Sequence, residues 1–134
     1  MLAQGRGVLV VVVSLHGQVA RPYGATQGMA AAGVRVLAAA LRQELRLGGA
    51  RGVAVTAVLA PEPGPAAPPF LRGRPERVAS TVVAQLRRPR LEKVAGGALT
   101  KAVVHGHALV PAATERLVAG RARDGAHTGI GNRW

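Results

Sequence analysis

The first residue with the means to do chemistry is Ser14, which ends an apolar run that begins at Val8. Consecutive Val and Leu residues without polar alternation are typical of a strand buried on both faces in a parallel sheet. A polar residue at the carboxyl end of such a strand lies where open α/β sheets bind ligands. Without a neighbouring base, however, a serine hydroxyl is a poor nucleophile and hydrogen-bonds to the turn that follows it. We therefore take Ser14 as the candidate site residue and favour the turn hydrogen bond as its role.

Other polar residues are weaker candidates. His105 and His107 have no carboxylate or third histidine near them at ligand spacing, so we expect packed or solvated histidines and no metal site. Glu44 is a lone carboxylate near a helix end, without a partner for acid–base catalysis. The chain contains no cysteine, which excludes disulfides and cysteine metal sites and fits a cytoplasmic protein.

The elements around Ser14 must hold it in place. A strand at residues 7–13 is followed by a turn at residues 15–24 and by a helical pattern from about residue 25 to residue 47. Gly28 and Gly33 each weaken that helix by roughly 1 kcal/mol relative to Ala, so we expect both to pack closely against another element. The apolar residues that share one helix face are Val34, Leu37, Leu41 and Leu45.

A second apolar run at residues 52–60 predicts another buried strand. Strand, helix and strand form a βαβ unit with parallel strands and a right-handed crossover. Five prolines within residues 61–69 predict an extended surface loop. Further on we expect a helix between Pro75 and Pro89, an edge strand at residues 92–95, and short helices at residues 99–107 and 112–118. The predicted fold class is α/β, a partial Rossmann-like (doubly wound) parallel sheet of about three strands with flanking helices.

Length and charge limit the function further. The 134 residues fit one domain, which we place at residues 1–120, followed by a disordered basic tail at residues 121–134. The net charge of +12 is spread over scattered arginines with few aromatic residues between them. Specific nucleic-acid binding is therefore the least favoured function, and weak adhesion at low salt is expected. The first apolar run is too short to span a bilayer, so we expect no membrane partner.

These features resemble the C-terminal half of the short-chain dehydrogenase/reductase (SDR) family. A strand ends in Ser14, Gly17 follows three residues later, a long helix closes on LRQEL, and the next strand reads GVAVTAVL. The resemblance covers about residues 5–120 and implies an NAD(P)-dependent oxidoreductase. In that family the serine polarises the substrate carbonyl or hydroxyl, and a tyrosine thirteen residues later transfers a proton. A lysine four residues after the tyrosine holds the nicotinamide ribose and lowers the tyrosine pKa.

Two alignments with that motif remain open. The ungapped alignment counts thirteen residues from Ser14, which places Gln27 at the tyrosine position and Ala31 at the lysine position. We prefer it because several residues then match types that the family commonly has: Val34, Arg35, Leu37, Glu44 and Leu45. The gapped alignment takes Tyr23 as the tyrosine and Gln27 at the lysine position. Either alignment loses the lysine, so we expect no hydride transfer.

The cofactor site also departs from the family. Pro63 and Gly64 match its Pro-Gly pair after the second strand only with about three extra residues, and Pro68 stands where the family has a cofactor-binding threonine. The family's Gly-rich dinucleotide loop lies upstream of the strand that here starts at Gly7. We therefore expect a truncated relative that does not bind NAD(P) tightly. The alternative function is a non-catalytic interaction module that docks through its helix or open strand edge onto a second copy or a full-length relative.

Overall fold

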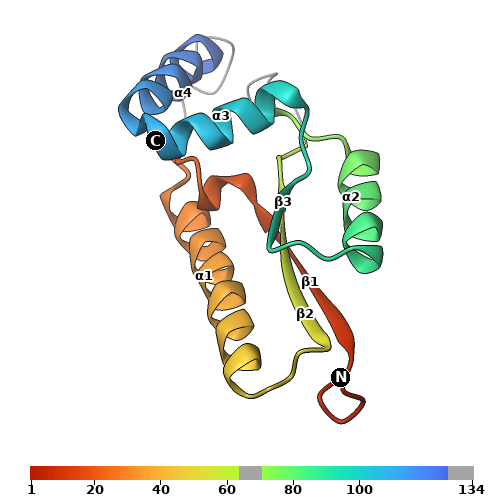
Figure 1. Cartoon of the computed structure of the whole chain (residues 1–134). Coiled ribbons are helices and arrows are strands. Elements are labelled where there is room, and N and C mark those ends of the chain that lie inside the picture. Colours follow the sequence, from red (N-terminus) through yellow and green to blue (C-terminus); the bar gives the residue numbers. More distant parts are fainter. Residues whose placement is uncertain (64–70, 127–134) are drawn as a thin grey trace.

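The computed structural model describes residues 1–63 and 71–126. Figure 1 shows a sheet with one helix on each side and two further helices across one end of it. In chain order the elements are β1 (Gly7–Ser14), the 3-10 helix η1 (Leu15–Gly17), α1 (Ala25–Leu47), β2 (Val53–Ala60), α2 (Pro75–Arg87), β3 (Glu92–Val94), α3 (Ala98–Leu109) and α4 (Pro111–Ala126). The sheet has three parallel strands in the order β1-β2-β3, which confirms the partial Rossmann-like α/β fold.

The element boundaries agree with the sequence pattern except near the C-terminus. There α3 and α4 are longer than predicted. Pro111 is the first residue of α4, a position where a helix tolerates proline, so it does not separate the two segments as widely as expected. The last helix continues to Ala126, within the segment predicted as a tail. The predicted proline-rich loop lies partly outside the described residues, as does the end of the tail. Among the residues that are described, no helix is long and apolar enough to cross a membrane.

β2 is the central strand of the sheet. It pairs with β1 from Gly7↔Val53 to Ser14↔Ala60, and with β3 over a shorter stretch on its other side. In the described chain β1 is therefore an edge strand, and its side chains are less covered than those of β2. Leu9 is 39% exposed and Val12 is 49% exposed. The prediction that this strand is buried on both faces is wrong, because an apolar run without alternation also occurs in an edge strand that helices cover only in part.

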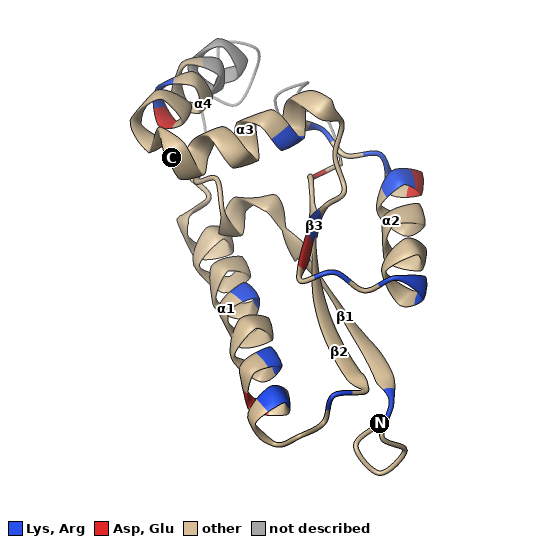
Figure 2. Ribbon diagram, in the orientation of Figure 1, with Lys and Arg blue, Asp and Glu red and all other residues tan. Residues whose placement is uncertain are grey.

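Only half of the predicted face of α1, the half-buried Leu41 and Leu45, packs on the sheet. Ala31 and Ala38 are buried there, whereas Leu37 from the predicted face is 57% exposed. Small side chains let the helix approach the sheet, and two arginines beside them contact polar groups of β2 and at β3. Figure 2 shows where the basic residues lie along α1. Nε of Arg35 lies 2.7 Å from a carboxylate oxygen of Glu92. The Arg42 guanidinium donates to the carbonyls of Val55 and Leu91 at 3.4 and 3.0 Å.

The turn after β1 packs directly on the start of α1. A Cβ at Gly28 would lie 3.1 Å from the carbonyl oxygen of His16, so the predicted close approach at Gly28 is confirmed. A Cβ at Gly17 would lie 2.7 Å from the carbonyl carbon of Ala31, which leaves no room for a side chain there. At Gly33 a Cβ would meet nothing within 4 Å, so the prediction of close packing is wrong for this glycine.

The apolar core lies at the carboxyl end of the strands. It is built from buried Leu and Val side chains: Val13, Leu15, Val19, Leu59, Leu71, Val94, Val104 and Val118. Val104 belongs to α3 and Val118 to α4, the two helices that lie across this end of the sheet in Figure 1. Open α/β sheets bind ligands at this edge, but here apolar side chains of the last two helices cover part of it.

Candidate functional site: a polar cluster at the end of β1

Ser14 closes β1 and begins the turn η1. Its Oγ accepts a hydrogen bond from the backbone N–H of His16 at 3.3 Å, and the same oxygen lies 3.3 Å from Nδ1 of the His16 ring. The serine thereby satisfies one of the N–H groups that a helical turn leaves free at its start. The predicted hydrogen bond between Ser14 and the turn backbone is present.

Glu62 lies two residues after the end of β2 and belongs to the same polar cluster as Ser14 and His16. β1 and β2 end in register at Ser14 and Ala60, so the residues that follow them meet at one edge of the sheet. Oε1 of Glu62 lies 3.2 Å from Nδ1 of the buried His16 ring. A carboxylate only accepts hydrogen bonds, so this contact places the proton of a neutral His16 on Nδ1.

Two more side chains hold the same carboxylate. NH1 of Arg21 donates to Oε2 of Glu62 at 3.1 Å, and Nε2 of Gln27 donates to Oε1. Gln27 lies in the first turn of α1, so Glu62 ties the helix to the turn after β1 and to the segment after β2. In the ungapped alignment Gln27 is the family's tyrosine position, and the structure connects it to Ser14 through Glu62 and His16.

The pKa of His16 lies below its ordinary value of 6.5. Burial is the largest cause, because it disfavours the charged imidazolium, and the Arg21 guanidinium lowers the pKa further. The Glu62 carboxylate raises the pKa by its charge and by its hydrogen bond, without outweighing burial. His16 is therefore neutral at pH 7, and its bond to Glu62 is a hydrogen bond between a neutral donor and a carboxylate.

The cluster contains a serine, a histidine and a carboxylate, but not in the arrangement of a catalytic triad. A triad needs the serine on one ring nitrogen and the carboxylate on the other, so that the first nitrogen is free to take the serine proton. Here the oxygens of Ser14 and Glu62 both lie against Nδ1 of His16. This nitrogen already carries the proton held by Glu62, so it does not activate Ser14. These hydrogen bonds join the residues that follow β1 and β2 to each other and to the first turn of α1.

The other predicted site residues lie outside this network. Tyr23 is fully exposed on a turn, with a left-handed φ of 61°. Ala31 is buried beneath Gly17 and has no polar side-chain atom. Pro63 follows Glu62 in an exposed segment without regular structure, and Gly64 lies outside the described residues.

Sequence reasoning did not identify His16, Arg21 or Glu62 as members of a site. A usable signal existed: His16 and Glu62 each lie within three positions of the end of a predicted strand, and each lies two positions after the end of the observed strand. Residues that follow two neighbouring parallel strands meet at one edge of the sheet. To predict this contact, one must know the pairing register of the two strands as well as where each strand ends. Within the described residues, no group of three or more metal-ligating side chains is present around His105 and His107 or elsewhere.

Comparison of the chain with protein-family models, with curated proteins and with solved structures gives no match in any of the three. The resemblance to short-chain dehydrogenases therefore rests on the residues quoted above.

Proposed function

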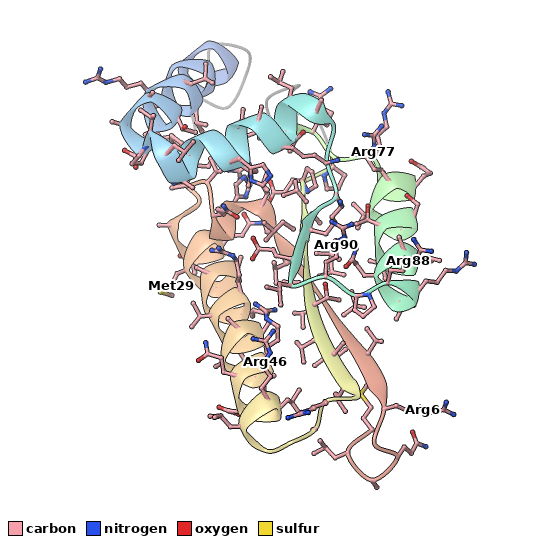
Figure 3. The ribbon with its side chains drawn as sticks, in the orientation of Figure 1. Arg6, Met29, Arg46, Arg77, Arg88 and Arg90 are labelled. Atoms are coloured by element: carbon pink, nitrogen blue, oxygen red, sulfur yellow. The ribbon has the colours of Figure 1, made fainter. Side chains whose placement is uncertain are left out.

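We propose that this chain, which is similar to short-chain dehydrogenases, does not transfer hydride and serves as a non-catalytic docking module. The observation that carries the proposal is an apolar face on α1 that no other described part of the chain covers. Met29, Val36 and Leu47 of α1 are 71%, 66% and 89% exposed. Together with Leu37 they form what we call the outer face of α1, and Figure 3 shows Met29 pointing away from the sheet.

The spacing of this face suits a helical partner. Met29, Val36 and Leu37 recur at the intervals of one helix side, with Gly33 between them. The exposed polar residues Gln43 and Glu44 separate Leu47 from this group, so the apolar patch is centred on the first half of the helix. Exposed apolar patches mark protein–protein contacts. Gly33 has open space where a side chain would lie, so a partner's side chain fits between Met29 and Leu37.

The edge of β1 supports the same function. In the described chain β1 has a strand neighbour on one side only, and it carries the half-exposed Leu9 and Val12. An edge strand with apolar side chains is a template for further pairing. We take a second copy of this chain as the partner that α1 binds, with a full-length relative as the other candidate, and the cytoplasm as the location because cysteine is absent.

The polar cluster supports the non-catalytic part of the proposal. The hydrogen bonds that join β1, α1 and the residues after β2 already use the side chains of Ser14, His16 and Gln27. At the lysine position of the ungapped alignment, Ala31 supplies no cation. Fluorescence titration with NADPH tests this part, and we expect no saturation in the micromolar range. Micromolar affinity for NADPH would contradict it. The docking part is tested by the molar mass of the chain in solution, for which we expect a dimer.

A further inference from the structure

A pocket at the opposite end of the sheet from the polar cluster is lined by cations and apolar side chains together. It has a volume of about 500 Å³ and lies between the C-terminal half of α1, the first half of β2 and the segment before β3. Four of its lining residues are arginines: Arg42, Arg46, Arg51 and Arg90. No carboxylate lines it in the described part of the chain.

We propose that this pocket binds a small organic anion that joins a phosphate or carboxylate group to an aromatic or other apolar body. Four arginines around one pocket repel one another unless an anion lies between them, and among the described residues none of the four forms an ion pair with a carboxylate. Arg–phosphate and Arg–carboxylate pairs are bidentate and charge-assisted, so they are among the stronger polar contacts.

The structure holds one of these arginines in place. Arg42 donates to the carbonyls of Val55 and Leu91, which fixes it between α1 and the sheet without neutralising its charge. Arg46 comes from α1 and Arg90 from the segment that leads into β3, so cations reach the pocket from two walls (Figure 3).

The remaining walls explain why the ligand needs an apolar part. Leu45 of α1, Val53 and Val55 of β2, and Pro89 and Leu91 before β3 line the same pocket. Pockets of a few hundred Å³ with an apolar lining and a few placed polar groups are typical of small-molecule sites. A guanidinium also stacks on an aromatic ring, which favours an aryl anion over inorganic phosphate.

Phenyl phosphate is the probe that tests the proposal by calorimetric titration of the full chain. We expect saturable binding that is about tenfold tighter than that of inorganic phosphate, because only phenyl phosphate uses both the arginines and the apolar walls. Phenol, which lacks the anion, should bind more weakly than phenyl phosphate. Equal affinity for inorganic phosphate, or no saturable binding of phenyl phosphate, would overturn the proposal.

A matched pair of double variants separates the pocket from the overall charge. Arg46→Gln with Arg51→Gln removes two exposed pocket cations and should weaken phenyl phosphate about tenfold. Arg74→Gln with Arg77→Gln removes the same charge at the start of α2, on the other side of the sheet and away from this pocket (Figure 3 shows Arg77), and should change the affinity less than about twofold. Arg90→Gln, which alters the opposite wall, should also weaken binding. Equal losses in the two double variants would show attraction to net charge alone and would refute a specific site.

Discussion

At the scale of single residues, the ionisation of His16 is coupled to folding. Its folded-state pKa lies below 6.5 because the ring is buried, so the unfolded chain binds a proton more readily than the folded chain. Above the pKa of His16 in the unfolded chain, the ring is neutral in both states and its titration does not change the free energy of unfolding. The penalty for protonating the folded chain grows as the pH falls through 6.5 toward the folded-state pKa, and the free energy of unfolding decreases accordingly.

The substitution His16→Asn tests this dependence. The Asn amide offers an N–H near the position of Nδ1, so the bond to Glu62 persists while the titration is removed. Urea unfolding at about pH 7.5 and about pH 5.5 should show a smaller loss of stability at the lower pH for this variant than for the wild type. His105→Asn, at an exposed position, is the control and should behave as the wild type. An unchanged pH dependence in His16→Asn would contradict the assignment.

At the scale of elements, the contact between η1 and α1 sets the position of the polar cluster. Gly17→Ala places a methyl group against the backbone of Ala31 and Ala32, at 2.7 and 2.8 Å, where neither atom can yield cheaply. We expect a loss of about 1–3 kcal/mol in the free energy of unfolding. Gly106→Ala in α3 is the matched control, because its Cβ would meet nothing within 4 Å. It should stabilise the chain by up to about 1 kcal/mol, since alanine favours a helix.

Chemical denaturation of the two glycine variants measures both effects under one condition. If Gly17→Ala were as stable as the wild type, the turn after β1 would not be packed on α1 as closely as the structure has it. The position of Gln27 relative to Ser14 would then be open to revision.

The elements themselves were largely predictable, because each depends on local patterns. The apolar runs of β1 and β2, the glycines around α1 and the prolines near α2 mark those segments without knowledge of the fold. The orientation of α1 was not predictable in the same way. Its Leu37 and Val34 make a plausible inner face, yet the helix turns Ala31 and Ala38 toward the sheet, where Arg35 and Arg42 find acceptors.

Of the residues in the candidate site, the sequence predicted Ser14 and, through the alignment, Gln27. The strand end and the following turn made the hydrogen bond of Ser14 foreseeable, since the donor lies two residues away in sequence. The contact between His16 and Glu62 joins residues 46 positions apart and exists because Ser14 and Ala60 are paired in register. Such a contact depends on the tertiary structure and therefore cannot be predicted from the spacing of residues along the chain.

At the scale of the whole molecule, the chain has two opposed features. Its polar cluster and core join β1, β2, α3 and α4 at the carboxyl end of the sheet. Its outer face of α1 and the edge of β1 remain apolar and uncovered. The first feature accounts for a serine that is not activated, and the second supports the proposal that the chain acts by binding another chain.

The molar mass of the chain in solution is the most direct test of that account. Size-exclusion chromatography with light scattering should give twice the chain mass of 13.7 kDa for the wild type. Met29→Glu with Val36→Glu places two charges on the outer face of α1 and should give the monomer mass, since burying unpaired carboxylates in an apolar contact is costly. Val83→Glu with Leu86→Glu, at exposed positions of α2, should leave the dimer intact. A wild-type chain that stays at the monomer mass across the accessible concentrations would contradict the account.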